Sequence, residues 1–130
     1  MNFVLIGVGF LIFAFISMQL LMVRMAKRSK GVQINGLEGS LKNLEKKGSR
    51  GLVYFYSPSC GACRAQTPII KEMQKKYKNI YDVDISRDMK TARVFGIKAT
   101  PTTISVQDGI IKEVLLGAKG RQTLEKIIQN

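Results

Sequence analysis

The chain has 130 residues, 45% of them hydrophobic and 23% charged, and this balance excludes both a disordered chain and a purely membranous one. It contains no histidine, so serine-protease and papain-like chemistry lack their usual base. Lysine and arginine outnumber aspartate and glutamate by 21 to 9. Dispersed positive charge favours anionic lipid, nucleic acid or acidic proteins, but a solvated surface is the simpler explanation and the one we prefer.

The first element in chain order is an apolar helix. Residues 3–23 include no charged side chain, and at about 1.5 Å per residue about twenty residues cross a hydrocarbon core of about 30 Å. The alternative is a buried core helix, but a domain of about a hundred residues is too small to surround one on every side. A cleaved signal needs positive charge before the apolar run, whereas here the charge follows it. We therefore expect a membrane anchor over residues 1–25 that contacts lipid through residues 3–23.

A basic block follows the apolar run and consists of Arg24, Lys27, Arg28 and Lys30. Positive residues beside a membrane helix favour the cytoplasmic side, so we prefer a domain that faces the cytoplasm. An extracytoplasmic domain remains the alternative, since a basic block is sometimes overridden. We interpret residues 26–36 as a basic linker and residues 37–130 as one domain.

The domain begins with a helical and then an extended pattern. Leu37, Leu41 and Leu44 recur at helical spacing and predict a short amphipathic helix over residues 39–47, with Ser40 as a possible cap. Residues 52–56 are a continuous apolar and aromatic run. Such a run is typical of a central strand covered on both faces.

A second helix is predicted from Gly61 onward, after a break at residues 57–59. Its apolar side carries Ile70 and Met73, and its lysines lie on the other sides. Pro68 lies within this helix and removes one main-chain donor, which predicts a kink.

The remaining elements alternate in type. We predict a strand at 80–85, a short helix at 88–95, strands at 102–106 and 110–116 joined by a turn at 107–109, and a last helix at 120–129. The Asp-Gly turn favours a hairpin, because it accepts positive φ at little cost. The order α-β-α-β-α-β-β-α indicates an α/β fold with a mixed central sheet and helices on both faces.

The two cysteines, Cys60 and Cys63, lie at the predicted junction of a strand and a helix. Two intervening residues allow a small disulfide ring, and a sulfur at a helix N-terminus favours the thiolate. Cys60 would attack, and Cys63 would resolve the mixed disulfide. A zinc site would require ligands from a second chain, so we expect no metal and no cofactor. A purely structural disulfide is a weak alternative, because so short a ring restricts the unfolded chain little.

The chain resembles the thioredoxin family over about residues 37–130. Four features carry the resemblance: the segment 54–63 around the cysteines, Pro68, the Thr-Pro-Thr at 100–102, and Gly-Ala at 117–118. The resemblance implies a thioredoxin-like fold. It also implies a cis proline at Pro101 beside the cysteines and a backbone at Thr100 that pairs with the substrate.

The chain departs from the family pattern near the cysteines. Ser59 replaces the family's tryptophan, Ala62 replaces a proline, and Tyr54 aligns with the family's buried acid. Asp82 on the neighbouring strand is a candidate proton acceptor for Cys63. The alternative, slightly preferred, is that Asp82 points to solvent.

These residues together predict a membrane-tethered thiol–disulfide oxidoreductase, working as a reductase. Its partners would be a disulfide-containing protein and a redox protein that recharges the dithiol. Two alternatives remain, a non-enzymatic adaptor subunit of a membrane complex and an extracytoplasmic oxidase or isomerase. Nucleic-acid binding is disfavoured, since the aromatic run is expected to be core strand.

Overall fold

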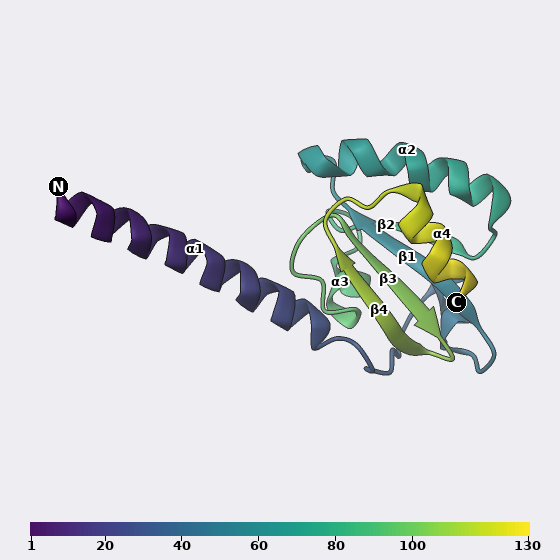
Figure 1. Ribbon diagram of the computed structural model, residues 1–130. Helices are drawn as coiled ribbons and strands as arrows, with labels where there is room; N and C mark the ends of the chain where they lie inside the picture. Colours follow the sequence, from purple (N-terminus) through teal and green to yellow (C-terminus); the bar gives the residue numbers. More distant parts are fainter.

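The structure, a computed structural model, describes residues 1–25 and 27–130 in full and the main chain of Ala26. A long N-terminal helix leads into a layered domain, in which helices cover a sheet (Figure 1). The elements in chain order are α1 (Asn2–Lys27), η1 (Gly39–Glu45), β1 (Arg50–Tyr56), α2 (Gly61–Lys76), β2 (Ile80–Asp84), α3 (Met89–Val94), β3 (Thr102–Gln107), β4 (Ile110–Leu116) and α4 (Arg121–Gln129).

The four strands form one mixed sheet in the order β2-β1-β3-β4. β1 is parallel to β2 and antiparallel to β3, and β3 is antiparallel to β4. Residues 52–55 of the central strand β1 are fully buried, which confirms the prediction of a strand covered on both faces. The expected fold class is therefore confirmed.

Alternation along β1 divides the core into two layers. Val53 and Phe55 face one side, where they meet η1 and α3. Leu52 and Tyr54 face the other side, where they meet α2 and α4. The first layer also contains Ile34, Leu37, Leu41, Leu44, Val83, Phe95, Ile104, Val106 and Ile111. The second also contains Ile70, Met73, Ile80, Leu124 and Ile128.

The segment expected as an α-helix over 39–47 is instead the 3₁₀-helix η1. Its two buried leucines, Leu41 and Leu44, are three residues apart and share one side of a helix with three residues per turn. Ser40 does not cap it: the capping position is Glu38, which makes no side-chain cap bond. A segment this short follows its buried leucines rather than its capping preference.

The hairpin between β3 and β4 is confirmed. Its two-residue loop places Asp108 at φ 55° and Gly109 at φ 74°. Two consecutive positive φ values define the type I′ turn that suits the strand twist. α2 continues through Pro68 without interruption, and the kink there stays a prediction.

Most of the N-terminal helix α1 extends away from the domain, and only its last turns contact it (Figure 1). Its stretch Asn2–Met25 is long and apolar enough to cross a bilayer, and its most apolar window has no buried residue. Its length and composition fit a membrane anchor or a targeting segment.

Residues 31–34, between α1 and η1, are bound to β4. Gly31 donates its N–H to the Ile111 carbonyl at 2.7 Å, and Ile111 donates to the Val32 carbonyl at 3.0 Å. Ile34 donates to the Gly109 carbonyl at 2.8 Å, and its side chain is 1% exposed. The segment expected as a linker therefore contributes to the edge of the sheet and to its core.

Candidate active site

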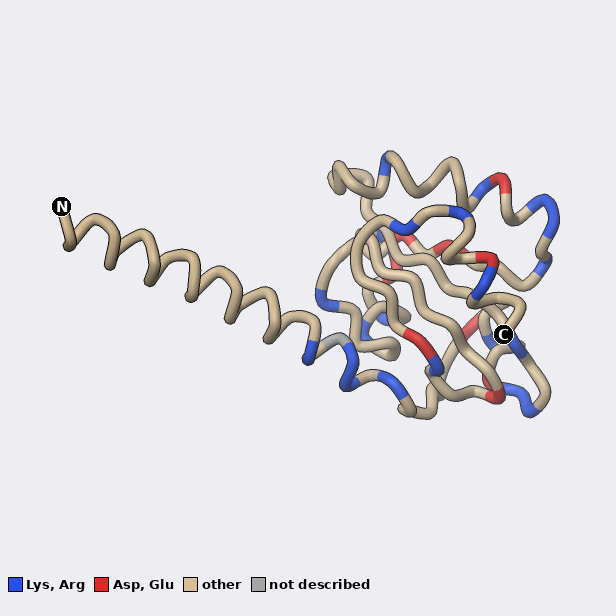
Figure 2. Tube along the Cα trace, viewed as in Figure 1, with Lys and Arg blue, Asp and Glu red and all other residues tan. Residues whose placement is uncertain are grey.

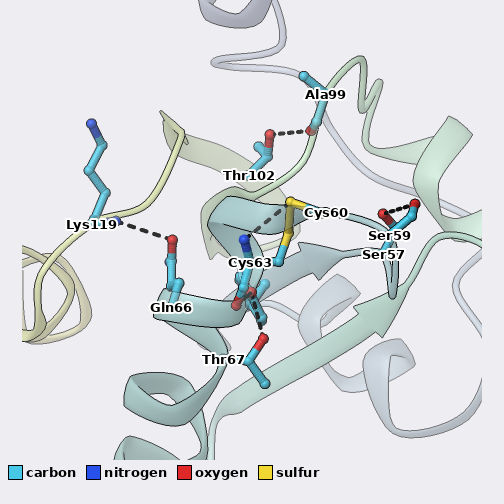
Figure 3. The surroundings of a disulfide bond; sticks show 10 residues. Ser57, Ser59, Cys60, Cys63, Gln66, Thr67, Ala99, Thr102 and Lys119 are labelled. Atoms are coloured by element: carbon cyan, nitrogen blue, oxygen red, sulfur yellow. Dashed lines mark hydrogen bonds between the residues drawn. A yellow bond between two sulfur atoms is a disulfide. The ribbon is translucent and has the colours of Figure 1, made fainter.

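The two cysteines are joined by a disulfide at the start of α2 (Figure 3). Their Cα atoms are 5.3 Å apart. Cys60 occupies the N-cap position of α2, and its Sγ accepts the main-chain N–H of Cys63 at 3.2 Å. Unpaired N–H groups and the helix dipole at this position stabilise a negative sulfur.

The two sulfur-bearing residues differ in burial. Cys63 is 2% exposed, whereas Cys60 is half-buried. Both cysteines line a groove whose walls include Pro58, Arg64 and Pro68. A reagent in this groove reaches Cys60 more readily than Cys63, because Cys63 is covered.

The Tyr54 hydroxyl binds the main chain of the second cysteine. It donates to the Cys63 carbonyl at 3.3 Å and lies 2.9 Å from Thr67 Oγ1. Its ring stacks on Tyr56, with centroids 5.5 Å apart. Burial raises the pKa of Tyr54, although the hydrogen bond with Thr67 acts in the opposite direction. A neutral hydroxyl therefore occupies the position that aligns with the family's buried acid.

Gln66 is a polar residue of the site that the sequence reasoning missed. It is fully buried on α2, and its Nε2 donates to Thr103 Oγ1 at 3.0 Å. Its Oε1 accepts the main-chain N–H of Lys119 at 3.1 Å (Figure 3). A glutamine in line with Ile70 and Met73 on the apolar side of the helix was the available signal. Gln66 ties α2 to β3 and to the loop before α4.

The Thr100–Pro101 peptide bond is cis, and Pro101 is buried. The strand β3 begins immediately afterwards, with Thr102 opposite Phe55 of β1. Thr102 Oγ1 donates to the Ala99 carbonyl at 2.7 Å, which closes the loop around the proline. The cis peptide therefore lies at the same end of the sheet as the C-terminus of β1, from which the chain continues to Cys60.

Asp82 lies on β2, opposite Tyr54 in the strand register. Its carboxylate accepts Gln74 Nε2 at 2.7 Å and Lys71 Nζ at 3.1 Å. Burial alone would raise the pKa of Asp82, but the hydrogen bonds from Gln74 and Lys71 and the charge of Lys71 lower it overall. The carboxylate holds its charge and is a weak base, and its role as proton acceptor stays a prediction.

Comparisons with known proteins agree with this geometry. A family model described as Thioredoxin matches residues 39–130. The chain is 36% identical over 81 residues to "Thioredoxin M4, chloroplastic" of Arabidopsis thaliana, covering 60% of this chain and 42% of the relative. It is 27% identical over 85 residues to a thioredoxin of Bacillus subtilis (strain 168), covering 62% of this chain and 82% of the relative.

Solved structures similar to this one include that of reduced Schistosoma mansoni thioredoxin pre-protein. Its TM-score is 0.60, with 30% identity over 71% of this chain and 90% of that chain. Mitochondrial thioredoxin 3 of Saccharomyces cerevisiae, in its oxidized form, has a TM-score of 0.58 and 25% identity over 68% of this chain and 85% of that chain. The chain spans less than half the length of the chloroplastic relatives from Arabidopsis and pea, 42% and 47%. Because the family model covers most of the chain, from residue 39 to residue 130, the protein belongs to the thioredoxin family.

Proposed function

We propose that this protein is a membrane-tethered thiol–disulfide oxidoreductase that works as a reductase on protein disulfides. The observation that carries the proposal is the unequal burial of two bonded sulfurs at a helix N-terminus, with Cys60 half-buried at the N-cap and Cys63 covered. This arrangement gives one sulfur that a partner reaches readily and a second that is largely covered and bonded to the first.

The reaction consists of two exchanges. The Cys60 thiolate attacks one sulfur of the substrate disulfide, a Cys60–substrate disulfide forms, and the other substrate sulfur leaves as a thiolate. Cys63 then loses its proton and attacks Cys60 Sγ, the Cys60–Cys63 disulfide forms, and the remaining substrate sulfur leaves. The substrate gains two electrons and two protons, and a dithiol partner returns them to the protein by the same exchange.

The substrate would bind at the edge of the sheet beside the cysteines. We infer that the backbone of Thr100 pairs with an extended substrate segment and that Pro101 packs beside its disulfide. Support comes from the position of this peptide immediately before β3, at the edge from which β1 continues to Cys60. We keep Asp82 as the candidate acceptor for the proton of Cys63, because it lies on the strand next to β1.

Residues 1–25 would anchor the protein in the membrane, residues 26–36 would connect the anchor to the domain, and residues 37–130 would carry the chemistry. The basic residues after the apolar run favour a domain in the cytoplasm, where the thiol pool is reducing. That setting favours the reductase direction. Thiol labelling with a membrane-impermeant reagent tests it: cytoplasmic placement predicts protection in intact cells and labelling in inverted vesicles. Labelling in intact cells would place the domain outside.

Reduction of insulin by the full chain in detergent, with a dithiol as electron donor, tests the activity. Cys60→Ser should lower the rate to that of the dithiol alone. Cys63→Ser should accumulate a mixed disulfide on Cys60, because the second exchange is missing. A wild-type rate no higher than that of Cys60→Ser would overturn the proposal and favour the adaptor role.

A further inference from the structure

The strand directions place the anchor and the disulfide at the same end of the sheet, where β1 and β4 terminate and β3 begins. β1 and β4 run in the same direction, since each is antiparallel to β3. One row across three strands marks this end: Phe55 of β1, Thr102 of β3 and Leu116 of β4. The chain leaves the row at Phe55 toward Cys60 and enters it at Thr102 from the cis proline.

The last turns of α1 contact the same end of the sheet, at β4 and the loop before β3. Met22 and Met25 line an apolar cavity with Leu116 and with the loop residues Ile97 and Ala99, just before Thr100. On the other side of α1, Val23 and Lys27 share a second pocket with the end of β4, including Leu116. The anchor therefore contacts the domain next to the peptide that we propose for substrate binding.

The segment after α1 holds this arrangement. The pairing of residues 31–34 with β4 leaves little free chain between the helix and the sheet. Lys30 Nζ also forms an ion pair with Glu113 Oε1 of β4 at 2.8 Å. A flexible tether would let the domain turn freely, whereas this one is bound to the sheet on which the site is built.

Residues before Met22 extend away from the domain (Figure 1). If they fill the hydrocarbon core, the bilayer surface begins beside the row of Phe55, Thr102 and Leu116. α2 begins at the end of the domain that lies toward α1, so the disulfide lies on this side as well (Figure 1).

The charge of this face fits an anionic bilayer. Arg64 lines the groove of Cys60, and Lys98 and Lys119 line the two pockets beside α1. Among the side chains that the structure describes, none of these three takes part in a salt bridge. Further lysines and arginines follow the end of α1 (Figure 2). Unpaired basic side chains beside a membrane helix are attracted to anionic headgroups.

We propose that the Cys60–Cys63 face is held against the bilayer surface, so that its substrates are disulfides of membrane-bound proteins at that surface rather than disulfides of freely diffusing proteins. This inference rests on the proposed function, and it adds the substrate class. The anchor here sets the direction in which the reactive sulfur points, as well as its compartment.

Fluorescence quenching tests the orientation directly. The full chain carrying Cys63→Ser, in vesicles of phosphatidylcholine and phosphatidylglycerol, is labelled on Cys60 with a thiol-reactive fluorophore. A control in the Cys60→Ser/Cys63→Ser background carries the label at Lys47→Cys, beyond the opposite end of β1. With a spin label on the lipid headgroups, the label on Cys60 should be quenched at least about threefold more strongly than the label at position 47. The strand β1 lies between the two positions and keeps them apart, since a strand rises about 3.3 Å per residue. Equal quenching, or stronger quenching at position 47, would overturn the proposal.

A rate comparison tests the substrate class. One disulfide peptide is supplied free or attached to the vesicle lipid, and a flexible insert of about twelve Gly and Ser residues, spanning about 20 Å, is placed between Lys27 and Arg28. The insert keeps the protein on the vesicle but frees the domain to turn. It should raise the rate with the free peptide several-fold and lower the preference for the attached one. Unchanged rates for both peptides would contradict the orientation, whereas a wild type inactive on both would remove the proposed function itself.

Charge reversal tests whether the basic residues near the site, Arg64, Lys98 and Lys119, orient the domain, or whether the positive charge of the whole protein does so. Lys98→Glu/Lys119→Glu should weaken the quenching of the Cys60 label in anionic vesicles. The matched control Lys76→Glu/Lys78→Glu changes the same charge near the C-terminal end of α2 and should leave the quenching unchanged. Equal effects of the two pairs would contradict the role of the basic face.

Discussion

The two ends of the sheet are built in different ways. At one end, the Asp108–Gly109 turn closes the hairpin, the Asp108 N–H donates to the Ser49 carbonyl, and Asp108 Oδ1 accepts the Gly48 N–H. At the other end, the chain leaves the sheet toward the disulfide. There the buried Tyr54 binds α2 at Cys63, and the buried Gln66 binds β3 and the loop before α4. A turn with positive φ and main-chain partners from residues 48 and 49 stabilises the closed end, whereas hydrogen bonds of two buried side chains position the reactive end.

The largest effect on stability is expected at Gln66, because it serves two elements at the reactive end. Gln66→Leu would leave Thr103 Oγ1 and the Lys119 N–H without their partner. Each group left unpaired costs about 1–3 kcal/mol, so the variant should lose about 2–6 kcal/mol in urea unfolding of the full chain in detergent. The exposed Gln122→Leu on α4 is the control and should change stability little. A loss at Gln66 no larger than at Gln122 would remove its positioning role.

Alanine variants of two glycines with positive φ, one at each end of the sheet, compare the stability of the two ends. A Cβ on Gly109 would lie 3.0 Å from the Glu45 carbonyl oxygen, whereas a Cβ on Gly117, at the reactive end, would meet nothing within 4 Å. Strain at positive φ costs about 1–2 kcal/mol, so Gly117→Ala should lose about 1 kcal/mol and Gly109→Ala more. Urea unfolding of both variants measures the difference. The insulin-reduction rate of Gly109→Ala should equal that of the wild type. A slower rate would show that the two ends are coupled.

Tyr54→Phe tests a single hydroxyl at the reactive end. The ring and its stacking on Tyr56 are retained, while the Cys63 carbonyl loses one donor. Loss of the hydrogen bonds to the Cys63 carbonyl and to Thr67 Oγ1 predicts a decrease of about 1–3 kcal/mol in urea unfolding. Because burial raises the pKa of Tyr54, its hydroxyl stays neutral and the pH profile of the second exchange should not change. A changed profile would assign the hydroxyl to the proton transfer.

Asp82→Asn should have the smallest effect on stability, below about 1 kcal/mol, because solvent screens this partly exposed pair. The folded-state pKa of Asp82 is lowered, so its contribution is complete above the unfolded value and is lost as the pH falls through the folded value. Urea unfolding at neutral and acidic pH should show the wild-type advantage shrinking below about pH 4.

The same variant tests proton transfer from Cys63. A mixed disulfide on Cys60 is formed with Ellman's reagent, and its release by Cys63 is followed by absorbance. If Asp82 accepts the proton, Asp82→Asn slows the release. An unchanged release rate would leave Asp82 with its pair to Lys71 and Gln74 only.

The sequence predicted the features of both ends that depend on local signals. The hairpin turn and the strand at residues 52–56 follow from local signals, an Asp-Gly pair and a continuous apolar run, and both were confirmed. The position of the cysteines at a strand–helix junction was also confirmed, because a break at Ser57-Pro58-Ser59 precedes the helical pattern.

Tertiary contacts account for what the sequence did not predict. Residues 31–34 read as a linker because nothing local indicates that they pair with β4, far along the chain. The bonds of Gln66 to Thr103 and Lys119 likewise join residues from separate elements. At η1, burial of Leu41 and Leu44 prevailed over the local helical preference.

The central claim is that one sulfur is reachable and activated while the other is shielded. Alkylation of the reduced full chain with iodoacetamide, followed at each cysteine by mass spectrometry over a range of pH, measures both properties at once. Cys60 should react at least about tenfold faster than Cys63 at neutral pH, with an apparent pKa below about 8.5. Equal rates at the two cysteines, or faster alkylation of Cys63, would contradict the account.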